Sequence, residues 1–523
     1  MVHDDDLAAT LDGLAAQALE YLGDHEEVWK RRARALRLNA LVHNDVRKAV
    51  TLTAAANLQL AARNWAAANA LLDYALPLAE AARDSLVTGQ IRAERSIARE
   101  ESGDHVGAAH DRDAASRAAR KVVALEVRER LLGFVNIAKG VAQRSASPSA
   151  AIAYFGRTID HQKRSSQSSL LPRLYYERAR ARAALGDHAG ERDDLRAGLD
   201  VIDSWERSIG TPEQRAAITV WGEAMRRDLI SVDLAGGDVA AAFAVSDTRP
   251  EPLISPTAHS AAVKPDVLRN LRAALASDAA VVELVRIREK FIVFVVRNGV
   301  ATAITLPSRA SRIAVTARAL RDAADDHFPT AAAELYTMVI APLRHYLEGV
   351  RTIAFIPDHD LTGLSLGSLL DRETNRYLGE DFIIVHAPTA AAAISMSREA
   401  RVRTGQNAVV IGANEFDRAK HPELDQLLNV AGEAKDIASV WPSALILTGA
   451  QVTSESLERQ LPQAAIVHFA GHITGHGANS RLIAVGNGLS ARDVARMRFD
   501  ATRVVILAAC RSSANHDSPV LYA

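Results

Sequence analysis

The first half of the chain has the hydrophobic pattern of helices, interrupted by short turn signals at a nearly regular interval. Residues 1–245 are rich in alanine, leucine and arginine and contain few runs of β-branched residues, which favours amphipathic helices over strands. The turn signals begin at Gly23, Arg63, Gly103, Ser147, Gly186 and Gly237. Most of them are about 40 residues apart, which is the spacing of stacked helical hairpins. This half is therefore predicted to be a helical-hairpin solenoid.

The second half instead alternates short apolar runs with helical stretches. The apolar runs cover residues 291–296, 352–356, 382–385, 408–411, 445–447, 466–470 and 504–508. Helical patterns lie between them, for example over residues 331–347 and 424–440. Continuous apolar runs are typical of strands that are buried on both faces of a parallel sheet. The pattern predicts an α/β sandwich with a largely parallel sheet.

A proline-rich segment separates the two patterns. It contains four prolines between residues 250 and 265, and proline at this density stops helices and marks a boundary. We therefore expect three segments: a helical repeat domain over residues 1–245, a linker over 246–265, and an α/β domain over 266–523.

Composition and charge indicate a globular protein and exclude several classes of function. Of the 523 residues, 48% are hydrophobic and 24% are charged, and the net charge is −1. A nucleic-acid-binding protein needs a concentrated basic excess, whereas arginines here alternate with acidic residues, as over residues 191–194. No lysine follows a glycine, which excludes a P-loop nucleotide site. We expect no nucleic acid and no cofactor.

The amino terminus and the cysteine content favour a cytoplasmic protein. Residues 1–6 are acidic and lack the basic and apolar parts of a secretory signal. No apolar run approaches the roughly 18 residues that a membrane span requires, so no membrane contact is expected. The single cysteine, Cys510, excludes an intramolecular disulfide and a four-cysteine zinc site, in keeping with a reducing compartment.

This cysteine lies two residues past an apolar run, and His472 lies two residues past an earlier one. Between the two runs, Ser490 and Asp493 form a capping-box pattern that predicts a short helix. Strand, helix and strand make one crossover unit with parallel strands. Parallel strands end at the same edge of a sheet and lie about 4.8 Å apart. We therefore expect Cys510 and His472 to meet as nucleophile and base.

Such a pair has a defined chemistry, and two other interpretations stand beside it. A nearby imidazole lowers the pKa of a thiol, and backbone N–H groups near Cys510 and after His472 would hold the oxyanion. A lone cysteine can instead be a small buried hydrophobe. The third interpretation is a zinc site of His468, His472 and His476, whose spacing by four needs a helix that the glycines at 471, 475 and 477 oppose. We expect no metal.

Several short motifs follow one another through the α/β half. They are Ile356–Leu361 with Leu364–Leu366, Tyr377–Glu380, His386–Thr389, His468–His472 and Val505–Cys510. In this order and spacing they resemble the CHAT domain over about residues 265–523. CHAT domains are similar to caspases and separase. The resemblance implies a caspase-like sandwich and a cysteine endopeptidase in which Cys510 is the nucleophile and His472 is the base.

The helical half resembles tetratricopeptide repeats, which often precede CHAT domains. Its period exceeds the usual length of about 34 residues. Stacked hairpins would leave a concave surface for a protein or peptide partner. The alternative is a helical bundle that binds no ligand.

The sequence departs from the CHAT pattern in two places. Glycine usually follows the catalytic histidine directly, whereas Ile473 follows His472 here and a Gly-His-Gly step appears around His476. His476 is therefore the reserve candidate for the base. The chain ends at Ala523, thirteen residues after Cys510, where related folds continue with further strands, so an open sheet edge is expected.

Together these patterns predict a regulated cytosolic cysteine endopeptidase with a protein substrate, whose helical repeats bind a partner or that substrate. The alternative is a catalytically inactive CHAT-like scaffold that acts as a protein-interaction module.

Overall fold

The chain folds into two compact units, Met1–Gly237 and Asp238–Ala523, in the computed structural model. The first unit is helical, and the second combines helices with a mixed sheet and a parallel sheet. This confirms the predicted fold class, helical hairpins followed by an α/β region. The structure describes residues 5–21, 25–41, 43–61, 63–164, 170–208, 212–248, 267–322, 328–358, 361–362, 364–402, 407–422, 424–427, 429–441, 443–475, 480–499 and 501–509.

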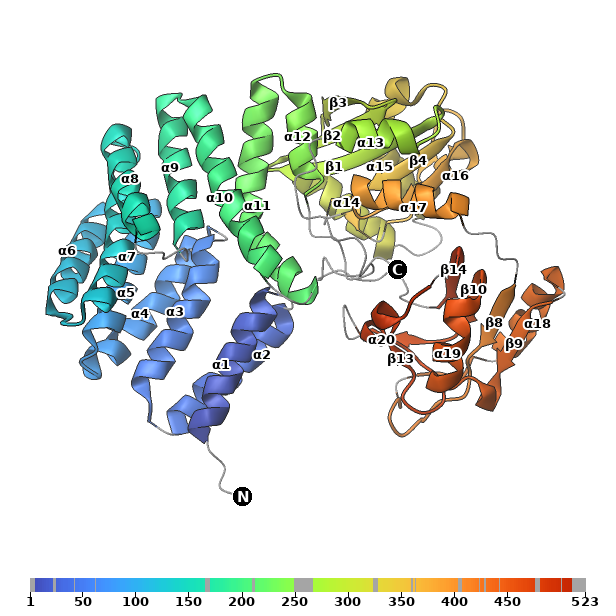
Figure 1. The fold of residues 1–523 in the computed structure, drawn as a ribbon, viewed down its shortest axis with the longest axis horizontal. Coiled ribbons are helices and arrows are strands. Elements are labelled where there is room, and N and C mark those ends of the chain that lie inside the picture. Colours follow the sequence, from blue (N-terminus) through green and yellow to red (C-terminus); the bar gives the residue numbers. More distant parts are fainter. Residues whose placement is uncertain are drawn as a thin grey trace. The chain divides into compact units, whose positions relative to one another are not determined.

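The first unit is built of helices that stand side by side in antiparallel pairs (Figure 1). They are α1 (Asp5–Tyr21), α2 (His25–Leu41), α3 (Asp45–Ala61), α4 (Trp65–Ala81), α5 (Ser85–Glu101), α6 (His105–Lys121), α7 (Leu125–Gln143), α8 (Pro148–Arg164), α9 (Leu171–Leu185), α10 (His188–Ser208) and α11 (Pro212–Ala235). The first six begin at residues 5, 25, 45, 65, 85 and 105, so each hairpin spans 40 residues. The predicted hairpin period is confirmed.

Several of the turn signals of the sequence are helix caps, and Asp84 is a cap that was not among them. The side chains of Asn64, Asp84, Asp104 and Asp238 each accept a hydrogen bond from a backbone N–H in the first turn of the next helix. This satisfies one of the donors that a helix start leaves without an intrahelical partner. Each of these four helices therefore begins at a residue that the local sequence specifies.

Two hairpins carry the same buried ionic cluster. Its residues are Arg95, Arg99 and Asp111 in α5–α6, and Arg178, Arg182 and Asp194 in α9–α10. Each residue of the second cluster lies 83 positions after its counterpart (95 to 178, 99 to 182 and 111 to 194). In both, the guanidinium of the first arginine binds the aspartate through two N–H groups, with the Nε contact at 2.8 Å. The two hairpins are structural repeats.

Further ion pairs join α5 to α9 although a complete hairpin, α7–α8, separates them in the sequence. Arg173 on α9 lies 3.1 Å from Glu94 on α5, which is fully buried. Arg144, which follows α7, lies 2.6 Å from Glu177 on α9 and also pairs with Glu101 on α5. The first helix, α1, in addition packs against the last, α11. Distant hairpins of this unit are therefore held together directly.

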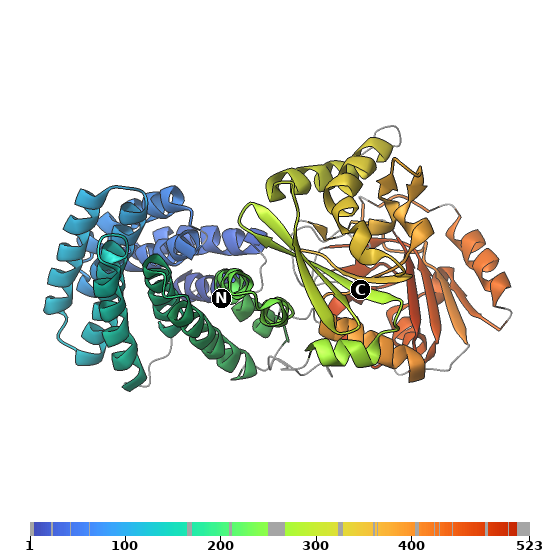
Figure 2. The ribbon, with the colours of Figure 1, turned by 90° about the horizontal axis from the view of Figure 1, so that it is seen from above.

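The second unit begins with a five-stranded sheet in the order β3-β2-β1-β4-β7. Strand β4 lies between β1 and β7 and is parallel to both, and the β1-β2-β3 edge is antiparallel. Helices α14 and α15 cover one face, and α13 and α17 cover the other (Figure 2). The elements are α12 (Val239–Ser246), α13 (Val267–Ala274), β1 (Ala279–Ile287), β2 (Lys290–Arg297), β3 (Val300–Thr305), α14 (Ala310–Asp322), α15 (Phe328–Val339), β4 (Thr352–Ile356), β7 (Ile383–His386) and α17 (Ala390–Val402).

A second sheet follows, with the order β14-β10-β8-β9 and all strands parallel. Val410 packs against α18 on one face, and Val467 and Phe469 pack against α19 on the other. The elements are β8 (Ala408–Gly412), α18 (Val430–Val440), β9 (Leu445–Thr448), α19 (Ser454–Gln460), β10 (Ile466–Ala470), β11 (Ile473–Thr474), β12 (Arg481–Leu482), β13 (Leu489–Ser490), α20 (Ala491–Arg496) and β14 (Val504–Ala508). The parallel strands are thus divided between two sheets.

All seven apolar runs form strands, but several details differ from the predictions. The buried strand β1 was not among the predicted runs, and Glu283 interrupts its apolar residues. Strand β3 was missed because its side chains are mostly half-exposed and form no apolar run. The helix expected over 331–347 is α-helical only to Val339 and continues as a 3₁₀-helix that contains Pro342, which cannot donate a backbone hydrogen bond. The helix expected over 424–440 begins only at Val430, because a loop occupies the residues before it.

Most of the expected linker, residues 249–265, lies outside the described residues. Helix α12, which precedes it, belongs to the second unit, since its Phe243 ring lies 5.6 Å from the ring of Phe294 in β2. Among the helices that the structure describes, none is long and apolar enough to cross a membrane.

We expect Asp111→Ala to destabilise the helical unit by about 3–5 kcal/mol, because the substitution leaves buried guanidinium groups without their counter-charge. The control is Asp73→Ala. Asp73 also binds Arg95, at 2.7 Å, but is 53% exposed, whereas the Asp111 side chain is 0% exposed. Loss of the Asp73 carboxylate should lower the free energy of unfolding by only about 0–1 kcal/mol. Urea unfolding followed by circular dichroism measures both values, and equal losses would contradict the role of burial.

The ion pairs of Glu177 predict a loss of stability in acid. Burial alone would raise the pKa of Glu177, but attraction to Arg180, Arg144 and Arg173 outweighs burial and holds the pKa below its ordinary value of 4.5. A carboxyl group with a lowered folded pKa contributes its full stabilisation above the unfolded pKa and loses it as the pH falls through the folded pKa. The stability advantage of wild type over Glu177→Gln should therefore shrink below about pH 4. Urea midpoints measured across that range test this, and a constant difference would refute it.

Candidate active site

The carboxyl ends of β10 and β14 lie side by side at one edge of the second sheet. The strands are parallel neighbours, and the last pair of their register is Ala470 with Ala508. The N–H of Gly471 donates to the carbonyl of Ala508 at 3.3 Å, which extends the contact one residue past β10. Helix α20 lies between the strands in sequence, with the capping box of Ser490 and Asp493 at its start. The predicted strand–helix–strand unit is present.

The backbone of His472 is held by a small sheet, β11-β12-β13. The carbonyl of His472 accepts a hydrogen bond from the N–H of Ile483 at 2.9 Å, and the next residues form β11. The turn between β12 and β13 contains Gly488 at a φ of 60°, where a Cβ atom would lie 2.2 Å from the carbonyl oxygen of Leu482. Only glycine fits this turn, so the local sequence fixes the position of the histidine.

The imidazole of His472 has two partners in the loop that follows β8. Its Nε2 lies 2.7 Å from the carbonyl oxygen of Asp425. Because a carbonyl oxygen only accepts, Nε2 carries the hydrogen and Nδ1 of the neutral ring is the acceptor nitrogen. The ring of Phe416 meets the imidazole edge to face, with centroids 5.5 Å apart and planes at 88°. The half-buried ring is thus oriented with its basic nitrogen identified.

This loop, residues 413–422 and 424–427, is called the β8 loop below. Neither of its contacts to His472 was predicted from the sequence, and part of it was predicted to be helix. Leu424, Leu427 and Val430 have helical spacing, but the N–H of Leu427 instead donates to the side chain of Asn414 at 3.0 Å. One feature of the sequence could have pointed to this loop as part of the site. Phe416 is a lone aromatic residue in a polar segment past the carboxyl end of a strand.

Of the three predicted site residues, the structure describes only His472. Cys510 and the reserve base, His476, lie outside the described residues, so their distances to His472 stay a matter of prediction. Counted along the chain, Cys510 is two residues past Ala508, as His472 is two residues past Ala470.

The helix that the zinc interpretation requires is not formed at His468. His468 lies within strand β10, so it does not share a helix face with His472. It is buried, and its Nε2 lies 3.2 Å from Glu433 of α18. No group of three potential metal ligands occurs among the residues that the structure describes. His468 is a core residue with an acidic partner.

Strand β14 lies at the edge of its sheet within the described part of the chain, where it pairs only with β10. Three of its apolar side chains are exposed: Val504 by 46%, Val505 by 51% and Ile506 by 38%. An edge strand leaves backbone donors and acceptors on its outer side without a strand partner. Residues 510–523, on which the expected open edge also depends, lie outside the described residues.

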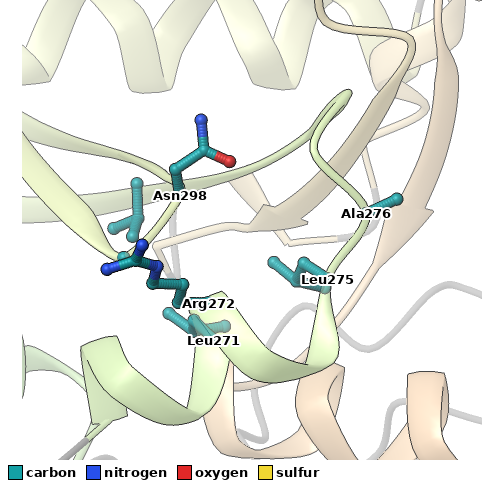
Figure 3. Close-up of a pocket in the computed structure, with 7 residues that line it drawn as sticks. Leu271, Arg272, Leu275, Ala276 and Asn298 are labelled. Carbon is teal, nitrogen blue, oxygen red and sulfur yellow. The ribbon is translucent and has the colours of Figure 1, made fainter.

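A small pocket lies elsewhere, between α13 and the β2–β3 turn (Figure 3). It is lined by Leu271, Arg272, Leu275, Ala276, Val296, Asn298 and Gly299. Its volume of about 10 Å³ is that of a single water site. Asn298 and Gly299 form a two-residue turn with φ of 51° and 78°, as tight hairpins require. This pocket is too small for a substrate.

The comparison with protein families agrees with the predicted CHAT domain. The family model described as "CHAT domain" matches residues 329–520, which contain β10, β14 and the β8 loop. A search of the curated proteins finds no match. Among solved structures, the chain is similar to the Saccharomyces cerevisiae separase–securin complex, at 8% sequence identity and a TM-score of 0.31. That match covers 86% of this chain and 46% of the other, so this chain spans less than half the length of the matched one.

Gly488→Ala should disrupt the small sheet that holds His472, because its Cβ would collide with the backbone at Leu482. Gly486→Ala is the matched control, since Gly486 also has a positive φ, 85°, but no atom lies within 4 Å of its Cβ position. Gly486→Ala should lower the free energy of unfolding by about 1–2 kcal/mol, and Gly488→Ala should lower it clearly more. Thermal unfolding of both variants measures the difference. Equal losses would show that the turn tolerates a side chain.

Proposed function

We propose that this protein is a cysteine endopeptidase in which Cys510 is the nucleophile and His472 is the base. The CHAT domain over residues 329–520 supports a caspase-like fold for this region. The enzymatic activity, the roles of the two residues and the protein substrate are the proposal.

One observation carries the proposal, the register of β10 and β14. Ala470 and Ala508 are the last pair, and His472 and Cys510 follow them by the same number of residues. Neighbouring strands lie about 4.8 Å apart. If both segments continue along the strand direction, the thiol and the imidazole come within hydrogen-bond reach.

The described geometry suits His472 for proton transfer. With its Nε2–H donated to Asp425, Nδ1 is the nitrogen that accepts the thiol proton. The thiolate then forms a bond to the peptide carbonyl carbon, the carbonyl π electrons move to the oxygen, and the imidazolium returns its proton to the leaving amine as the C–N bond breaks. Water, losing a proton to the imidazole, attacks the resulting thioester and restores the thiolate.

The helical unit is proposed to bind a protein partner or the substrate. Stacked hairpins present an extended surface, and exposed apolar side chains occur on it, among them Tyr74 at 70% and Val106 at 84%. The tetratricopeptide resemblance, the regulation and the cytoplasmic location belong to the same proposal. If no cleavage is detected, the alternative function is indicated, a scaffold without catalytic activity.

Cys510→Ala should abolish cleavage of an unfolded protein substrate or of the chain itself. His345→Ala is the control, because His345 is a surface residue of the same unit with 83% of its side chain exposed. Gel electrophoresis and mass spectrometry of the products measure cleavage. Equal cleavage by wild type and Cys510→Ala would exclude the proposed nucleophile.

The chain has a single thiol, so its alkylation by iodoacetamide reports on Cys510 alone. A thiol paired with an imidazole reacts at a pH below the ordinary thiol pKa of about 8.5. His472→Ala should move that reactivity to higher pH, whereas His345→Ala should not. An unchanged pH profile in His472→Ala would remove His472 as the base.

A further inference from the structure

We infer that Asn414 and Phe416 are positioning residues for His472. They shape the β8 loop so that the carbonyl of Asp425 keeps the hydrogen on Nε2 of the imidazole and leaves Nδ1 free to act as the base. The inference rests on the proposed function, since it describes how that base is held. Neither residue is proposed to contact the substrate or the reacting atoms.

The two ends of the β8 loop are fastened. At its start, the N–H of Ala413 donates to the carbonyl of Ala470 at 2.8 Å, which joins the loop to the end of β10. At its end, the N–H of Leu427 donates to Oδ1 of Asn414 at 3.0 Å. The Asn414 side chain therefore closes the loop, and Asp425 lies two residues before the closing point.

Phe416 supports the ring of His472 from another side. Its own ring contacts two imidazoles, with its centroid 5.5 Å from that of His472 at 88° and 6.4 Å from that of His421 at 73°. Both contacts are edge to face, the arrangement that aromatic rings favour. A flip of the His472 ring by 180° would place a carbon atom against the Asp425 carbonyl and lose the hydrogen bond. Phe416 thus holds the plane of the imidazole, and the Asp425 carbonyl selects which of its two flipped orientations the ring takes.

This orientation matters because a base works only with its acceptor nitrogen toward the proton. When the partner that selects the imidazole tautomer is lost in other hydrolases, the rate falls although the remaining geometry is intact. Here the partner is a backbone carbonyl, which no substitution can delete. Its position depends on the side chains that shape the loop, so Asn414 and Phe416 are the residues through which this function can be tested.

The test is nuclear magnetic resonance of the full-length protein with ¹⁵N-labelled histidine, in which the His472 signals are identified by their loss in His472→Gln. Wild type should show the tautomer with hydrogen on Nε2. Asn414→Ala and Phe416→Leu should each shift the population toward the other tautomer. Asn414→Asp keeps the acceptor oxygen and Phe416→Tyr keeps the ring, so both should restore the wild-type signals.

The activity of the same variants gives a second readout. Loss of positioning should lower kcat by up to about a hundredfold in Asn414→Ala, with KM nearly unchanged and recovery in Asn414→Asp. The resonance measurement does not depend on catalysis. It therefore tests the positioning of His472 even if the chain cleaves no peptide and the proposed function is wrong. Unchanged His472 signals in both Asn414→Ala and Phe416→Leu, or a loss that the conservative variants do not restore, would overturn the inference.

Discussion

The candidate site depends on the register between β10 and β14. Two hydrogen bonds fix this register just before the strands begin. The N–H of Arg503 donates to the carbonyl of Ala465 at 2.7 Å, and the buried hydroxyl of Thr502 donates to the carbonyl of Leu461 at 3.1 Å. A slip by one residue would turn every side chain of β14 to the opposite face. The equal offset of His472 and Cys510 from the last pair would then be lost. Residues far from the candidate chemistry therefore set its geometry.

The helical unit uses charge where a solenoid ordinarily uses apolar contact between adjacent repeats. Its many alanines allow close helix packing but bury little side-chain area, and arginine–carboxylate pairs add specific contacts between helices. A buried ion pair costs desolvation and gains net stability only with good geometry and further hydrogen bonds. The pairing of Arg95 with both Asp111 and Asp73 has that geometry. Such contacts determine which helices pack together and also how strongly they are held.

Much of the fold could be predicted because local signals coincide with element boundaries. The caps at Asp104 and Asp187 and the apolar runs of the parallel strands are strong signals in a single sequence. The half-exposed strand β3 has no such signal. The β8 loop was misjudged because its leucines have helical spacing while tertiary contacts, which no local pattern encodes, hold it open. For the same reason His472 could be found from the sequence, whereas the Asp425 carbonyl could not, and Phe416 carried only the weak signal of a lone aromatic residue in a polar segment.

The contact between α1 and α11 has a mechanical consequence. An open array of hairpins extends gradually, as a spring does, because each repeat touches only its neighbours. Here the two ends of the array are fastened to each other, and α5 is tied to α9 as well. A pulling force would meet resistance until the terminal contact ruptures, and the extension would then come in one abrupt step.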